Sequence, residues 1–273
     1  MATIQAAKCY GLHHLGAIAP GYQADFVVLD NLDEMNVLEV YHKGNKIIRD
    51  EKVEIRPCSP QLKNTVHLLG FKESNLRLPW KQGRVHIIKM FAGQIVTEDI
   101  MEEVGYVDEN GQKFFKADET YQKIAAVERH KNTGKVGVGI VKGFGLQGGA
   151  IASSVSHDSH NLIVIGDNDH DMYLAVQELL RVQGGYTLVE NGEVFDTLPL
   201  PIMGLMSDAG YEKVNEKLAR MIPKAHEMGI PKGFDPFITL SFMALPVIPQ
   251  IRITPRGVYL TKEDRMIQSP FDH

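Results

Sequence analysis

The sequence predicts a mixed fold, α/β or α+β, in which strands are interleaved with a few helices. Three observations carry this prediction. Short apolar segments bounded by turn residues recur along the chain, the aliphatic run at residues 162–165 is typical of a central strand, and few segments have the apolar spacing of a helix. With 273 residues, 44% of them apolar and 23% charged, the chain can bury a sizeable core.

The first 55 residues are expected to form small β structure behind one short helix. Residues 3–10 have the spacing of an amphipathic helix, and Gly11 stops it. Three short strands are predicted next, at residues 25–30, 37–41 and 46–48. The turn Gly44-Asn45 joins the last two strands as a hairpin. A chain that opens on a lone short helix has the pattern of the end of a larger unit, so we expect an element before it.

Residues 56–83 are expected to form an irregular connection across a surface. Four residues interrupt any period there: Pro57, Pro60, Pro79 and Gly83. A second, larger unit is predicted for residues 84–273. Its predicted strands are a hairpin of residues 85–91 and 94–96, then residues 121–130, 136–141 and 162–165, and a hairpin of residues 186–190 and 193–195 around Asn191-Gly192.

Two helices are predicted in this larger unit. The first begins at a cap among residues 167–169, runs to about Val182 and ends at Gly184-Gly185. The second is capped by Ser207 or Asp208, and Pro223 is expected to disturb or end it. The tail, residues 237–260, mixes apolar runs with prolines and has no clear period.

The composition argues against several classes of partner. A net charge of -5 and a pI of about 6.1 give no basic surplus for nucleic acid or an anionic membrane. Apolar runs are too short to span a bilayer, and the opening residues lack the pattern of a signal peptide. Two cysteines, Cys9 and Cys58, stand far apart without a motif, so we expect a reducing, cytoplasmic location.

A glycine-rich segment is the first candidate for chemistry. Gly143, Gly145 and Gly148 form a G-x-G-x-x-G pattern after a predicted strand, and Asp167 stands 19 positions beyond Gly148. This spacing is typical of a dinucleotide-binding loop. The alternative is a tight loop between two strands of a sheet, because the residues that follow favour turns over helix.

A polar stretch between two apolar strands is the second candidate. Residues 153–161 contain serines, two imidazoles and a carboxylate, which are costly to bury without partners. His157 and His160 are candidates to bind a metal, orient a substrate or move a proton, and Asp158 to fix a histidine tautomer. The alternative is a solvent-facing loop whose side chains cap its own backbone.

Other histidines and several absent motifs limit the choice further. His130 stands at the end of a predicted strand, and a lone histidine at such a position usually has a structural role. The acidic segment around His170 is explained either by carboxylates at the start of a helix or by a cation site. The sequence contains no H-x-H, no H-E-x-x-H, no H-x-E followed by P-C-x-x-C, and no G-x-S-x-G. No complete hydrolytic site is recognised.

Two sets of residues resemble known families. The first resembles the closing segment of amidohydrolase-superfamily enzymes, where the last barrel helix leads into a small β-sandwich: Ala2-Thr3, Ala6-Ala7, Gly11-Leu12, Gly16-Ala17-Ile18-Ala19-Pro20-Gly21, Ala24-Asp25-Phe26-Val27-Val28-Leu29 and Gly44. The second resembles the C-terminal domain of adenine deaminases: Val141-Lys142-Gly143-Phe144-Gly145, Gly149-Ala150-Ile151-Ala152-Ser153, His157-Asp158-Ser159-His160-Asn161, residues 198–208 and Leu245-Pro246-Val247-Ile248-Pro249.

The resemblance implies an end of a barrel helix with β-sandwich strands at residues 1–55, a linker at 56–83, and the C-terminal domain at 84–273. It implies hydrolysis of adenine to hypoxanthine and ammonia by a manganese or iron centre whose ligands precede residue 1, so no metal ligand is placed in this chain and it is expected to be inactive alone. His157, Asp158 and His160 match the family motif and are expected to face the active site or a subunit interface.

The resemblance also bears on partners. A barrel-bearing chain or domain, or self-association into a homo-oligomer, is expected to cover the exposed apolar faces of residues 3–55. Two alternatives remain open from the sequence: a nucleotide-binding module built on Gly143, Gly145 and Gly148, and a non-catalytic interaction protein that kept the fold.

Overall fold

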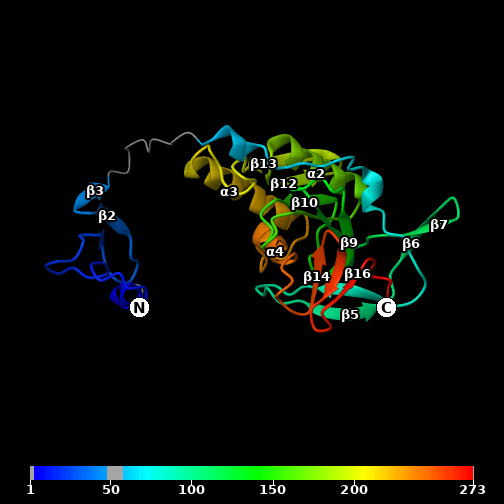
Figure 1. Ribbon diagram of the computed structural model, residues 1–273, viewed down its shortest axis with the longest axis horizontal. Helices are drawn as coiled ribbons and strands as arrows, with labels where there is room; N and C mark the ends of the chain where they lie inside the picture. The colour runs from blue at the N-terminus through cyan, green and yellow to red at the C-terminus, as the bar shows by residue number, and fades with distance from the viewer. Residues whose placement is uncertain (1–2, 48–57, 273) are drawn as a thin grey trace. The chain divides into compact units, whose positions relative to one another are not determined.

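The computed structural model describes residues 3–47 and 58–272, and the chain divides into two units, Met1–Ile55 and Arg56–His273 (Figure 1). Ala2 of the amidohydrolase-like segment, Ile48 at the end of the third predicted strand, residues 49–55 and Pro57 lie outside the described residues. No helix within the described ranges has both the length and the apolar character needed to cross a bilayer.

The first unit contains a short helix and a three-stranded antiparallel sheet. The elements are α1 (Ile4–Cys9), β1 (Phe26–Leu29), β2 (Val37–His42) and β3 (Asn45–Ile47), with strand order β1-β2-β3. Gly11 follows the helix with a φ of 68°, a left-handed conformation that suits glycine and ends the helix there. The elements predicted for this part of the chain are therefore confirmed within the described residues.

The second unit is built on one eight-stranded sheet. Its strands are β4 (Val85–Lys89), β5 (Glu98–Glu102), β8 (Tyr121–Val127), β9 (Val136–Lys142), β10 (Gly149–Ser153), β11 (Leu162–Gly166), β12 (Gly185–Glu190) and β13 (Glu193–Pro199). They lie in the order β13-β12-β10-β11-β8-β9-β4-β5, in which β4 and β9 are parallel and every other pair is antiparallel. Every residue of β10 and β11 is buried, as their aliphatic composition predicts.

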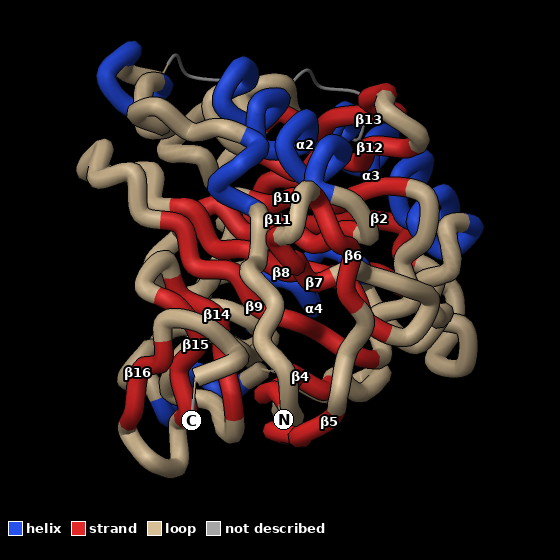
Figure 2. The backbone as a smooth tube through the Cα atoms, turned by 90° about the vertical axis from the view of Figure 1, so that its right-hand side faces the viewer, coloured by secondary structure: helices blue, strands red, loops and turns tan. Residues whose placement is uncertain are grey.

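Both faces of this sheet are covered (Figures 1 and 2). Helix α2 (Asp169–Val182) packs on one face, against β10, β11, β12 and β13. Helices α3 (Tyr211–Glu227) and α4 (Pro236–Phe242), with a small sheet of β14 (Ile251–Thr254), β15 (Gly257–Leu260) and β16 (Arg265–Ile267), pack on the other. Alternation along β11 divides the core, since Ile163 and Ile165 join one apolar cluster and Leu162 and Val164 the other.

Two predicted boundaries in this unit are wrong. The hairpin partner of β4 is β5, not residues 94–96, because Thr97 exchanges backbone hydrogen bonds with Pro249 and Gln250 instead. Helix α3 is preceded by Gly210 rather than capped by Ser207 or Asp208. The Ser207 hydroxyl accepts from the Ala209 amide, and the Asp208 carboxylate pairs with Lys63.

Helix α3 also continues through Pro223 to Glu227. The proline removes one amide donor, but Met221 and Ala225 are buried in the core cluster and hold the helix on the sheet. Residues 58–83 contain two 3-10 turns, Pro60–Lys63 and Glu73–Leu76, and are packed more closely than a surface connection. Val66, Leu76 and Leu78 are buried there.

Several elements had no prediction. They are the hairpin of β6 (Tyr106–Glu109) and β7 (Gln112–Phe115), helix α4, and the sheet β14-β15-β16. Helix α4 does carry a readable signal, because the Asp235 carboxylate accepts the amides of Phe237 and Ile238, and Pro236 takes the first helical position.

Candidate functional site

The polar stretch forms the end of β10 and the loop from β10 to β11, and it is partly buried. Ser153, Ser154, Ser156 and Asn161 are buried. The Ser154 hydroxyl donates to the Gly204 carbonyl at 2.5 Å, and the Ser153 hydroxyl donates to the Val155 carbonyl at 3.1 Å. The solvent-facing alternative is therefore wrong for these three serines, whereas Ser159 is exposed. The hydroxyls of Ser153 and Ser154 hold the loop backbone, and the imidazoles of His157 and His160 remain partly exposed.

The two candidate histidines lie together. The rings of His157 and His160 are 6.1 Å apart between centroids, and the His157 ring stacks on Phe242 of α4 at 4.9 Å. The amide of His157 donates to the Ser241 carbonyl at 3.1 Å, which ties the loop to the same helix. The His157 side chain remains 41% exposed, so the pair is held in place and can still be reached by a partner.

The protonation of His160 follows from its surroundings. The Ser156 amide donates to its Nδ1 at 3.3 Å, so the neutral ring carries its proton on Nε2. Burial, and then the nearby charges of His157 and Arg129, lower the pKa of His160 below its ordinary value. At neutral pH the ring is therefore neutral and presents an N–H donor.

Asp158, the third candidate, is placed differently. Its side chain is 84% exposed, and its Oδ1 lies 3.7 Å from Nδ1 of His157. That separation is too long for a hydrogen bond, so the carboxylate acts on His157 only as a weak, solvated charge.

Residues outside the predicted stretch support this loop. His130 lies beside it, with Nε2 2.7 Å from the Ser159 carbonyl, and so has the structural role that the sequence favoured. Its neighbour Arg129, which the sequence did not single out, is buried and donates from Nε to the His160 carbonyl at 2.5 Å. Phe242 was also missed, because its contact with His157 joins residues 85 positions apart.

The glycine-rich segment is a tight loop joining β9 to β10. A strand follows it instead of the helix that a dinucleotide-binding loop needs. The amides of Gly148 and Gly149 donate to the Asp167 carboxylate at 2.6 and 3.1 Å, and a Cβ at Gly143 would lie 2.8 Å from the Met90 carbonyl oxygen. Since the protein itself fills the positions that a pyrophosphate would take, the nucleotide-binding alternative is wrong.

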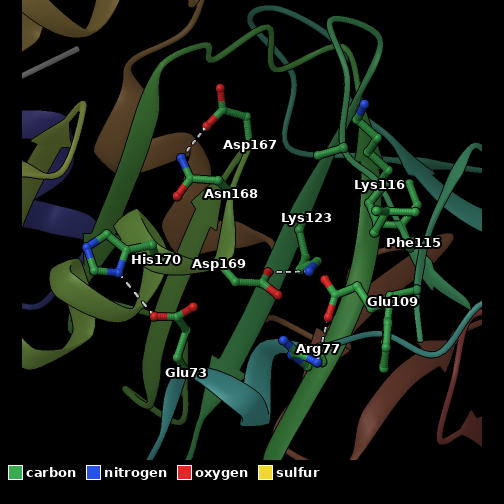
Figure 3. Close-up of a pocket in the computed structure, with 13 residues that line it drawn as sticks. Glu73, Arg77, Glu109, Phe115, Lys116, Lys123, Asp167, Asn168, Asp169 and His170 are labelled. Carbon is green, nitrogen blue, oxygen red and sulfur yellow. Dashed lines mark hydrogen bonds and ion pairs between the residues drawn. The ribbon is translucent and has the colours of Figure 1, made fainter. Parts of the chain in front are cut away.

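A cavity of about 320 Å³ lies at the start of α2, and six of its charged side chains form three ion pairs (Figure 3). Lys123 pairs with Asp169, Arg77 with Glu109 at 2.9 Å, and His170 with Glu73 at 3.1 Å. Burial lowers the pKa of Lys123.

The cap of α2 is Asn168, whose side chain accepts the Asp171 amide at 2.8 Å. The acidic segment around His170 therefore belongs to the helix start and to its ion pairs. Across residues 3–47 and 58–272, no group of three or more His, Cys, Asp or Glu side chains is arranged to hold a metal ion.

Two family models match this chain, one in each of its units. The family model "Adenine deaminase C-terminal domain" matches residues 94–265, and "Amidohydrolase family" matches residues 1–48. An adenine deaminase of Desulfitobacterium hafniense is 52% identical over 268 residues, which cover 98% of this chain and 46% of that protein. Adenine deaminases of Nitratidesulfovibrio vulgaris and Clostridium acetobutylicum are each 43% identical, covering 95% of this chain and 45% and 46% of those proteins.

The chain thus spans about half the length of the curated relatives it matches. The family match covers most of the larger unit, including strands β5 to β13 and the loop of residues 154–161 that carries His157 and His160, called here the imidazole loop. The resemblance read from the motifs is confirmed, and the chain belongs to the adenine deaminase C-terminal domain family.

Proposed function

We propose that this chain forms the C-terminal part of an adenine deaminase and acts together with an amidohydrolase barrel. Two findings support the proposal. The amidohydrolase match precedes the C-terminal domain match along the chain, and relatives about twice as long are named adenine deaminase. Residues 1–55 would then be the end of a barrel helix with β-sandwich strands, 56–83 a linker, and 84–273 the C-terminal domain.

The reaction proposed for the whole enzyme is hydrolysis of adenine to hypoxanthine and ammonia. Water adds to the purine carbon that bears the amino group, and this group leaves as ammonia after it takes up a proton. The family implies a divalent metal, with manganese or iron as the proposed identity. Since the described residues do not fit a metal ion, no step on this chain is assigned to it, and the chain alone is expected to be inactive.

The imidazole pair of His157 and His160 carries the proposal for this chain. It is a pair of titratable groups on a fixed loop, reachable from outside, with His160 neutral and presenting its Nε2 proton. We place the pair at the active site of the complete enzyme or at a subunit interface. There it orients the purine or carries the proton toward the leaving amino group, with Asp158 at its exposed rim.

A chimera tests this proposal. The chain replaces the matched half of the Desulfitobacterium adenine deaminase, and adenine turnover is measured for His157→Ala, His160→Ala and the control His170→Ala. Loss of a proton-transfer or orienting group lowers kcat by about 100-fold or more, while His170, at the cavity of Figure 3, leaves kcat unchanged. Wild-type kinetics in both loop variants contradict the proposal, and an inactive parent chimera favours a non-catalytic interaction protein.

The partners, substrate and location that we propose follow from the same assignment to an adenine deaminase. The barrel-bearing part of the enzyme, or a second copy of this chain, covers the apolar residues of the first unit, and the assembled enzyme is a homo-oligomer. Adenine is its substrate, and the cytoplasm is its proposed location.

A further inference from the structure

Arg129 is a buried cation without a counter-ion among the described residues. It is 1% exposed and follows strand β8. The acceptors of its guanidinium among the described residues are neutral oxygens, and burial lowers the pKa of the guanidinium to about 10. A charge buried in this way is costly, so its hydrogen bonds have to account for its presence.

The guanidinium of Arg129 joins three distant segments. Its Nε donates to the His160 carbonyl at 2.5 Å, one terminal nitrogen donates to the Thr65 carbonyl at 2.8 Å, and the other donates to the Met203 carbonyl at 2.9 Å. The Thr65 hydroxyl accepts a further bond at 3.1 Å. The planar fork of an arginine fits such divergent acceptors, whereas a lysine ammonium does not.

Two further residues, Asn161 and Gly204, support the contact between Arg129 and the imidazole loop. The Asn161 side chain accepts the Arg129 amide at 3.3 Å, next to the carbonyl that the guanidinium holds. On the other side, a Cβ at Gly204 would lie 2.9 Å from a terminal nitrogen of Arg129, so only glycine leaves room for this arrangement. The guanidinium of Arg129 thus holds the backbone at His160 directly, and Asn161 and Gly204 support that contact.

Arg252 provides an internal comparison. It is 0% exposed, burial lowers the pKa of its guanidinium to about 10 as well, and its acceptors are the carbonyls of residues 95, 248 and 249 and the Thr97 hydroxyl. Its bonds fasten the segment before β5 to the start of β14. The two arginines have the same chemistry, and only Arg129 contacts the imidazole loop.

We propose that Arg129 is a positioning residue that sets the placement of the His157 and His160 imidazoles for the deamination reaction. The inference about turnover rests on the proposed function, whereas the placement of the rings is tested in the 273-residue chain itself. Arg129→Lys keeps the charge but loses the fork, and Arg252→Lys is the matched control.

The first experiment is an NMR titration of the histidine rings in the chain. Arg129→Lys is expected to move the ring signals of His160 and His157, and Arg252→Lys to leave them in place, with Trp80 fluorescence confirming that each variant is folded. Thr65→Val, which removes one acceptor, gives a smaller shift in the same direction and serves as the test if Arg129→Lys does not fold. Ring signals unmoved in these variants overturn the placement.

The second experiment is a double-mutant cycle in the chimera. Arg129→Lys alone is expected to lower kcat by about 10- to 100-fold, and combining it with His160→Ala should add little to the loss from His160→Ala. Fully additive losses would mean that Arg129 acts independently of the ring and overturn the proposal. If turnover survives both histidine substitutions, the proposed function fails, while the NMR titration still decides whether Arg129 places the rings.

Discussion

The two units of the chain form secondary structure equally well but differ in what their apolar side chains contact. In the first unit, across residues 3–47, Ala7 is the only buried apolar residue. Its exposed apolar side chains come from all three strands, the loops between them and the segment that precedes β1: Leu12, Ile18, Val27, Val28, Leu32, Met35, Val37, Leu38, Val40 and Ile47. The second unit buries apolar residues on both faces of its sheet.

This difference teaches that a regular sheet is not by itself a domain. The strands β1 to β3 pair their backbones in antiparallel ladders, and the turns that bring neighbouring strands together are specified by a few residues of sequence. Stability in water, however, comes mainly from removing apolar area from solvent. The first unit is therefore a regular sheet whose apolar side chains lie at its surface, as its proposed covering by a barrel-bearing part or a second copy requires.

The largest expected effect is on association. Because the apolar faces of the first unit are open, the full chain is expected to self-associate, and a chain of residues 56–273 to be monomeric. Sedimentation velocity over a range of concentrations measures this. Unfolding of the second unit, followed by the fluorescence of Trp80, should be unchanged by the deletion. A monomeric full chain would show that the exposed apolar faces of the first unit do not drive association.

Two leucines on strands test the difference in packing. Leu162 of β11 is fully buried, whereas Leu38 of β2 is 63% exposed. Leu162→Ala is expected to lower the free energy of unfolding by about 3–4 kcal/mol, because it removes core contacts and leaves a cavity. Leu38→Ala is expected to change it by about 0.5 kcal/mol or less. Urea unfolding followed by circular dichroism measures both, and equal losses would contradict the comparison.

The N-cap residues of two helices, one in each unit, give a further comparison with a smaller expected effect on stability. The Asn168 side chain caps α2 by accepting the Asp171 amide, whereas Thr3 makes no capping bond to α1. Asn168→Ala is therefore expected to cost about 1 kcal/mol in the free energy of unfolding. Thr3→Ala should leave the thermal unfolding midpoint unchanged, and a larger shift than in Asn168→Ala would show that the cap is not the cause.

Acid provides the most subtle test. Burial acts to raise the pKa of Glu128, but hydrogen bonds from the amides of Thr133, Lys131 and His130 and from the Thr133 hydroxyl outweigh it and lower the pKa to about 2. A carboxylate with a lowered folded-state pKa contributes stability above its ordinary value of 4.5, and this contribution is lost as the pH falls toward 2.

The stability difference between the wild type and Glu128→Gln should therefore shrink between these two pH values. Asp25 in the first unit also has a lowered pKa, chiefly through the Lys43 amide, but it lies at an exposed position. Asp25→Asn is expected to show a weaker pH dependence in urea unfolding. A constant difference for Glu128→Gln from pH 7 to pH 2 would show that its hydrogen bonds do not hold in solution.

The sequence by itself determined the elements whose signals are local. The strands β1 to β3, the aliphatic strand β11, helix α2 with its cap and terminating glycines, and the hairpin of β12 and β13 all follow from spacing and turn residues. Motifs over much of the chain also identified the family, and the polar stretch containing His157, Asp158 and His160 was recognised as unusual.

Only the tertiary structure decided which distant segments meet. The parallel pairing of β4 with β9, the small sheet β14-β15-β16, and the packing of α4 depend on contacts between residues far apart in the chain. The same holds for the stacking of His157 on Phe242 and for the guanidinium of Arg129, whose acceptors lie 31, 64 and 74 positions away. Such contacts leave no periodic trace in the sequence, because side chains that meet in three dimensions need no regular spacing along the chain.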